Sequence, residues 1–152
     1  MERQIVSDVE AARSELGTPR TRPSWREGRH SLPFHELSGD EFEVFSFVLL
    51  VKEHPNDQIS YFGKTGDGGR DIIHNKEGRV RLIQCKRYGK NVGVGEIRSE
   101  LAKLCVNVFT SRIPKAPDEV VFYVVPDVTA DAADLIKDQA KWRREAPKAL
   151  DD

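Results

Sequence analysis

The stretch "GDGGRDIIHNKEGRVRLIQCKRYGK", residues 66–90, places polar side chains inside an otherwise apolar segment. Asp71 comes directly before two isoleucines, and Gln84 and Lys86 interrupt a run that is mostly apolar. Burying a carboxylate, an amide and an ammonium group costs free energy unless the groups satisfy one another or serve a chemical purpose. The role of these three side chains is therefore the first question that the sequence raises.

The pattern around them predicts a β-hairpin. Residues 70–75 and 79–88 are rich in β-branched and apolar side chains, and "KEG" separates the two runs. If Glu77 and Gly78 are the central residues of the turn, residues whose numbers sum to 155 lie opposite each other. The prediction depends on this register, because a shift by one residue would move every side chain to the other face.

In this register Asp71 lies opposite Gln84 and diagonally across from Lys86, on one face of the hairpin. Cys85 points to the other face. A carboxylate, an amide oxygen and a strand carbonyl form an all-oxygen site that suits Mg²⁺, and a nearby lysine can orient water or hold a phosphoryl oxygen. These groups suffice for metal-assisted hydrolysis of a phosphodiester. A buried Asp–Lys ion pair that only satisfies itself is the alternative, and the residues leave it open.

The rest of the chain predicts an α/β protein with a mixed sheet. Ser38 and Glu41 have the spacing of a capping box at the start of a helix, and Thr129 is a candidate N-cap. Periodicity predicts helices over 3–16, 38–54 and 95–110 and from 129 onward, and further strands over 58–63 and 119–125. Two expectations concern packing: the strand 119–125 is buried on both faces, and the helix 95–110 turns inward Ile97, Leu101, Leu104 and Val108.

Length and composition limit how many domains the chain can form. The 152 residues suit one main domain, which we expect over 37–147, after an N-terminal helix and basic linker (1–36) and before a charged tail (148–152). We interpret the linker as a solvated connector. The alternative is a basic arm that contacts the phosphate backbone of a nucleic acid. The longest apolar run, residues 44–51, is too short to span a membrane, and the charged N-terminus does not resemble a signal peptide, so we expect a cytoplasmic protein.

"GDGGRDII" followed by "IQCKRY", after "LSGDEFEVFSFVLL", resembles the Mrr-type restriction endonucleases of the PD-(D/E)xK nuclease superfamily. In that branch a glutamine replaces the second acidic residue, which gives an Asp…Gln-x-Lys signature. The resemblance covers residues 37–125 and implies the restriction-endonuclease-like fold, a mixed central β-sheet flanked by helices. The segment 52–65 departs from the family because it lacks the usual Gly-Tyr exit from the leading helix.

Carried over by position, the resemblance implies a role for five residues. Asp71 is the main metal ligand, Gln84 stands where the second acidic ligand would be, and the backbone carbonyl of Cys85 completes the set. Lys86 is the catalytic lysine. Glu43, in the Phe-Glu pair of the leading helix, is the acidic residue that approaches the metal; Glu41 is the alternative, although its place in the capping box already gives it a structural reason. The implied cofactor is Mg²⁺, with Mn²⁺ as a substitute.

A local basic patch predicts where DNA binds. Residues 79–103 carry seven cations against two acids, a net charge of +5 in a chain whose total is −1. Such a patch suits contact with the phosphate backbone, although an ordinary solvated strand end has the same composition. The expected DNA-binding residues are Gly68, Gly69, Arg87, Tyr88, Lys90 and Arg98. The chain's four histidines show no spacing typical of metal ligands, and His74 is predicted to be a packed or surface residue.

The resulting expectation is a Mg²⁺-dependent DNA endonuclease in restriction or antiphage defence. It would act on double-stranded DNA as a homodimer or higher oligomer, because one active site cuts one strand. Two alternatives stay open. The chain is a catalytically silent nuclease-fold module that binds nucleic acid or a protein, or it is the N-terminal effector domain of a larger protein.

Overall fold

A computed structural model of the chain describes residues 9–16, 34–62, 71–110, 116–138 and 140. The chain divides into two compact units. The first contains residues 1–87 and 117–123, and the second contains residues 88–116 and 124–152. Among the described residues, no helix is both long enough and apolar enough to cross a membrane.

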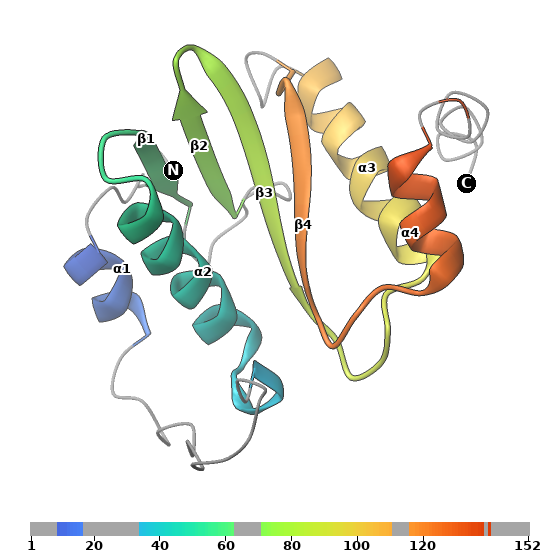
Figure 1. Cartoon of the computed structure of the whole chain (residues 1–152), viewed down its shortest axis with the longest axis horizontal. Helices are drawn as coiled ribbons and strands as arrows, with labels where there is room; N and C mark the ends of the chain where they lie inside the picture. Colours follow the sequence, from blue (N-terminus) through green and yellow to red (C-terminus); the bar gives the residue numbers. More distant parts are fainter. Residues whose placement is uncertain (1–8, 17–33, 63–70, 111–115, 139, 141–152) are drawn as a thin grey trace. The chain divides into compact units, whose positions relative to one another are not determined.

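The helices of the first unit precede its strands in the sequence (Figure 1). They are α1 (Val9–Glu15), a short 3-10 helix η1 (Phe34–Glu36) and α2 (Gly39–Glu53). The start of α2 is capped as predicted, because Glu41 N–H donates to Ser38 Oγ at 3.2 Å and Ser38 N–H donates to Glu41 Oε2 at 2.7 Å. These reciprocal bonds satisfy backbone donors that a helix start leaves unpaired.

The sheet has the strand order β1-β2-β3-β4 and is mixed (Figure 1). β1 (Gln58–Tyr61), β2 (Ile72–Lys76) and β3 (Arg79–Arg87) pair antiparallel in sequence order. β4 (Glu119–Val125) begins at the same end as β3, because Asp118 N–H donates to Val80 O at 2.8 Å, so these two strands run parallel. The predicted order of helices and strands is therefore confirmed, with η1 as an addition.

The turn between β2 and β3 confirms the predicted hairpin register. Glu77 has φ 52° and Gly78 has φ 80°, the left-handed conformations that a two-residue type I′ turn requires. Ile72 lies opposite Ile83, and the pairing continues to the turn without a bulge. Residues on opposite strands therefore sum to 155, as the sequence predicts.

The core of the first unit lies between α2 and the face of the sheet that carries Tyr61, Ile72 and Ile83. Phe47 of α2 stacks on Tyr61 with ring centroids 5.7 Å apart, and both side chains are buried. Removing a buried phenylalanine side chain typically costs about 3–5 kcal/mol. This packing holds α2 against β1, β2 and β3, and it fixes the helix that carries Glu43.

The second unit contains α3 (Val94–Phe109) and α4 (Ala130–Lys137). Thr129 caps α4 as predicted, because Ala132 N–H donates to its Oγ1 at 3.3 Å. The predicted inward face of α3 is wrong in part: Ile97 and Leu104 are buried, but the other buried residues are Glu100 and Asn107 instead of Leu101 and Val108. Lys103 Nζ lies 2.8 Å from Glu100 Oε1 and gives that buried carboxylate a cation.

The packing predicted for β4 is also wrong. Val125 is its buried residue, and the residues from Val120 to Val124 are half-buried. The physical reason is its place in the sheet: β4 is the last strand in the order, so it has a neighbouring strand on one side, whereas the prediction treated it as central. An apolar run without polar alternation does not by itself distinguish a central strand from an edge strand.

Candidate active site

The hairpin brings Asp71 and Gln84 together. Asp71 comes directly before β2, and its backbone carbonyl accepts a hydrogen bond from Phe62 N–H at 2.9 Å, which extends the β1–β2 ladder by one residue. The register of β2 and β3 places it opposite Gln84. Both side chains are buried, with exposed fractions of 2% and 1%. A carboxyl and an amide group therefore lie side by side away from bulk water.

The Asp71 carboxylate is oriented by the backbone of the neighbouring strand. Cys85 N–H donates a hydrogen bond to Asp71 Oδ2. A bond from an N–H to a charged carboxylate is about twice as strong as one between neutral groups. The middle residue of the Gln-x-Lys triplet thus positions the aspartate through its backbone, whatever its side chain does.

The pKa of the Cys85 thiol depends on the charged side chains near Asp71. Burial raises the pKa of the Cys85 thiol well above the ordinary range, and the negative charges of Asp71 and Glu43 raise it further. A hydrogen bond with Ser46 and the positive charge of Lys86 act in the opposite direction. Both carboxylates and the lysine therefore lie within electrostatic reach of one thiol, and α2 brings Glu43 to the same region as the hairpin residues.

Lys86 is half-buried and shares the face of Gln84, because side chains alternate along β3. The next residue, Arg87, is exposed, and its guanidinium donates a hydrogen bond to the backbone carbonyl of His35 in η1. Arg87 therefore ties the segment before α2 to the end of β3. The hairpin brings together Asp71, Gln84 and Lys86, and Glu43 lies within electrostatic reach of Cys85 from α2; their catalytic roles stay predictions.

The predicted DNA-binding residues do not all belong to this group. Arg87 is part of the first unit, whereas Tyr88, Lys90 and Arg98 are part of the second. Tyr88 N–H donates to Val125 O at 2.9 Å, and Lys90 Nζ lies 3.3 Å from Glu96 Oε1. Gly68 and Gly69 lie outside the described residues.

The basic patch is partly neutralised by its own ion pairs. The cations concerned are Lys90 with Glu96, Lys103 with Glu100, and Arg81 with Glu119 at 2.5 Å. Glu96 also accepts from Gly93 N–H at 3.0 Å, and backbone N–H groups together with Lys90 lower the pKa of Glu96. Glu96 and Glu100 are already subtracted in the net charge of +5 for residues 79–103, whereas Glu119 lies outside that range, so its pairing with Arg81 lowers the charge of the patch by one more.

The donor atoms fit a hard divalent cation. Asp71 offers carboxylate oxygens and Gln84 an amide oxygen, both from buried positions that face each other, and the Cys85 carbonyl would add a third oxygen. Mg²⁺ prefers such oxygens and retains several waters, so three protein donors are enough. The residues present therefore fit the ion that the sequence predicts.

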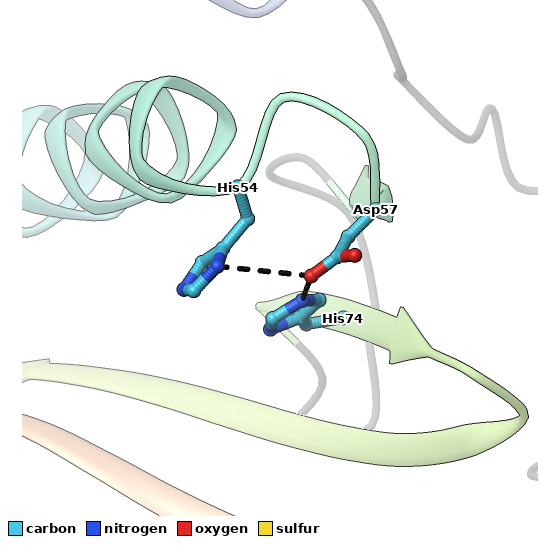
Figure 2. Close-up of side chains that lie close together, drawn as sticks. All are labelled: His54, Asp57 and His74. Carbon is cyan, nitrogen blue, oxygen red and sulfur yellow. Dashed lines mark hydrogen bonds and ion pairs between the residues drawn. The ribbon is translucent and has the colours of Figure 1, made fainter.

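A second group of side chains was missed by sequence reasoning. His54 at the end of α2, Asp57 before β1 and His74 in β2 lie together (Figure 2). His74 is fully buried, and its Nε2 lies 2.8 Å from Asp57 Oδ2, a hydrogen bond that lowers the pKa of Asp57. The prediction that His74 is a packed residue is correct as far as burial goes. Its partners could be found only with the β1–β2 pairing, which places His74 opposite Ile59.

A mixed sheet combined with helices, and an Asp…Gln-x-Lys set on adjacent strands, define an α/β protein of the restriction-endonuclease-like class. A family model described as a restriction endonuclease, Mrr_cat, matches residues 34–142. The match covers more than two thirds of the chain, and the chain belongs to the Mrr_cat family of restriction endonucleases. No curated protein and no solved structure matches the chain.

Proposed function

We propose that this protein is a Mg²⁺-dependent endonuclease that hydrolyses phosphodiester bonds in double-stranded DNA. One observation carries the proposal. Two buried polar side chains, Asp71 and Gln84, face each other across the hairpin, and the Asp71 carboxylate is held by the backbone of the strand that also carries Lys86. Membership of a restriction endonuclease family supports DNA as the substrate class.

Each residue has a distinct task in this proposal. Asp71, Gln84 and the Cys85 carbonyl would hold the ion, and Mg²⁺ or Mn²⁺, when bound, supplies Lewis-acid charge beside the scissile phosphate. The Lys86 ammonium donates hydrogen bonds to a phosphoryl oxygen and orients the attacking water. Glu43 adds negative charge from α2, and Cys85 N–H keeps the Asp71 carboxylate in place.

DNA contact would come from residues around the end of β3. Arg87 is exposed next to the site, and Tyr88, Lys90, Arg98 and the glycines 68 and 69 are the further candidates. Because such contacts go mainly to phosphates, affinity should fall steeply as the salt concentration rises. We also propose a domain over 37–147 and a cytoplasmic role in restriction or antiphage defence.

Cutting both strands requires two sites, so the active form would be a homodimer or a higher oligomer. Light scattering coupled to size-exclusion chromatography, with and without DNA, tests this part. A strict monomer that still makes double-strand breaks would contradict it.

A supercoiled-plasmid assay tests the catalytic proposal. We expect nicking or linearisation with Mg²⁺, its loss in EDTA, and a fall of at least about 100-fold in Lys86→Ala, the range typical of a lost acid–base group. Lys52→Ala, an exposed lysine of α2, is the matched control and should cut normally. Cleavage that survives in Lys86→Ala overturns the assignment. DNA binding without any cleavage would favour the silent module or an effector domain that lacks the rest of its protein.

A further inference from the structure

His54, Asp57 and His74 form a compact group outside the candidate active site (Figure 2). Asp57 Oδ2 lies 2.8 Å from His74 Nε2 and 3.7 Å from His54 Nδ1. One ligand atom from each residue lies within 4.8 Å of the other two. Two imidazole nitrogens and a carboxylate oxygen thus converge on one small volume.

The three side chains are held by separate elements of the first unit. His54 ends α2, where its N–H donates to Leu50 O at 2.9 Å. Asp57 N–H donates to His54 O at 3.1 Å, which closes a tight turn between the helix and β1. His74 is fixed within β2 by its pairing with Ile59. The group is therefore positioned by hydrogen-bonded backbone and not by a long loop.

The three side chains of the histidine group differ in how far they are exposed to solvent. The side chain of His74 is 0% exposed, that of Asp57 is 17% exposed and that of His54 is 31% exposed. The inner ligand is thus shielded from solvent, and the outer one borders it. This grading provides a path by which an ion could enter and a position that water could fill.

Hydrogen bonding alone gives an incomplete account of this group. The 3.7 Å separation between His54 Nδ1 and Asp57 Oδ2 is too long for a hydrogen bond, although the two imidazole rings lie only 4.8 Å apart, centroid to centroid. Among the described residues, the buried Nδ1 of His74 has no hydrogen-bond partner. The nitrogens that face Asp57 are Nε2 of His74 and Nδ1 of His54, so a metal ion beside Asp57 Oδ2 would use these two and not Nδ1 of His74.

A metal ion accounts for the spacing. Ligands about 2.0–2.1 Å from a tetrahedral Zn²⁺ lie about 3.3 Å from each other. The separations of 2.8 and 3.7 Å from Asp57 lie on either side of that value, so small side-chain movements would complete the geometry. Imidazole nitrogens select zinc and other first-row transition metals over Mg²⁺, which prefers oxygen.

We propose that His54, Asp57 and His74 form a second metal site, which binds Zn²⁺ through two nitrogens and one oxygen, with water as the fourth ligand. Its ligands join the end of α2 to β1 and β2, so the bound ion clamps the helix to the sheet. Any agent that binds the folded state and not the unfolded one stabilises the fold. The site is independent of the nuclease proposal, because it shares no residue with it.

Calorimetry and thermal unfolding test the site on the metal-free full chain with any affinity tag removed. All samples carry Cys105→Ser, because an exposed thiol also binds zinc. We expect one equivalent of Zn²⁺ to bind and to raise the melting temperature, and this equivalent to persist in Asp71→Asn. In His54→Asn the affinity should fall at least about tenfold, since even partners of metal ligands contribute 10–100-fold.

His35→Asn is the matched control, because His35 is an exposed histidine whose side chain lies outside the group. Co²⁺ provides a second readout: an intense visible absorption from tetrahedral cobalt should appear in the parent protein and in His35→Asn and be absent from His54→Asn. Equal Zn²⁺ affinity in His54→Asn and His35→Asn would overturn the proposal, and so would a parent protein that binds neither ion. These readouts do not depend on DNA cleavage.

Discussion

Two groups of polar side chains lie beside the same strand, β2, and differ in the atoms that they offer. Asp71 and Gln84 present oxygen, whereas His54, Asp57 and His74 present two nitrogens and one oxygen. Because side chains alternate along β2, Asp71 and His74 face opposite sides of the hairpin. The exposed fractions of these two residues, 2% and 0%, are nearly the same. The innermost residues of the two groups are therefore buried alike, and their donor atoms distinguish what each group can bind.

Asp71→Asn should have the largest effect, because it should abolish the function of the oxygen group and leave the histidine group intact. Asparagine keeps an oxygen for the Cys85 N–H but loses the charge that holds Mg²⁺, so we expect plasmid cleavage to fall by more than about 100-fold, beyond the effect of losing a partner of a ligand. The Zn²⁺-induced rise in melting temperature should remain. Asp134→Asn, an exposed aspartate of α4, is the control for the substitution itself. Loss of both responses would mean that the two groups are not independent.

Gln84→Glu tests whether the side chain at position 84 faces the Mg²⁺ ion. The change restores the acidic residue that the PD-(D/E)xK pattern has at this position, but it adds a second negative charge at a site that is 1% exposed. Without metal we expect a loss of about 1–3 kcal/mol in the free energy of unfolding. Saturating Mg²⁺ should recover most of that loss, as measured by urea unfolding. If Mg²⁺ stabilises the variant no more than the parent protein, Gln84 does not face the ion.

Gly78→Ala tests whether both groups depend on one turn. Gly78 has φ 80°, a conformation that an alanine side chain strains, so we expect a loss of about 1 kcal/mol in the free energy of unfolding. Gly89→Ala is the control, because a Cβ there meets nothing within 4 Å and its backbone is not left-handed. If the hairpin register shifts, cleavage and the zinc response should weaken together. A change in one response alone would argue that the register is set elsewhere.

The thiols give the smallest and most local test. Burial, with the charges of Asp71 and Glu43, raises the pKa of Cys85, so its thiol should stay protonated at pH 8 while the exposed Cys105 reacts. A thiol reagent should modify one cysteine in the folded protein and both in denaturant. The number of cysteines modified in the folded protein should fall to near zero in Cys105→Ser. The raised pKa also means that Cys85 contributes stability below its unfolded pKa, which is lost as the pH rises above that value. Rapid native labelling of Cys85 would place its side chain on the wrong face.

The parts of the fold that the sequence predicts well are those determined by neighbouring residues. The Ser38 capping box, the Glu77-Gly78 turn and the register between Asp71 and Gln84 each follow from short spacings. These local rules were enough to bring the candidate active-site residues of the hairpin together. Glu43 needed the family resemblance, because no spacing relates a helix residue to a strand that begins much later in the chain.

The parts that failed depend on distant residues. The burial of Glu100 and Asn107 on α3 cannot be read from hydrophobic periodicity, which favours leucine and valine at the inward positions. The histidine group requires knowing that β1 pairs with β2, which brings His74 close to the residues that follow α2. A set of metal ligands can be recognised in a sequence when all of them are close together along the chain. Here His54 and Asp57 are close, but the third candidate ligand, His74, comes from a later strand.

The hydrogen bond from Cys85 N–H to Asp71 has a consequence for how this protein can vary. At position 85 the backbone serves the aspartate, and the side chain packs beside Ser46 on the other face. A family of functional variants should therefore accept any small apolar residue there but never proline, which has no N–H to donate. Position 85 would thus vary among small apolar residues and still exclude proline, which a saturation library would detect as the absence of proline from an otherwise tolerated set.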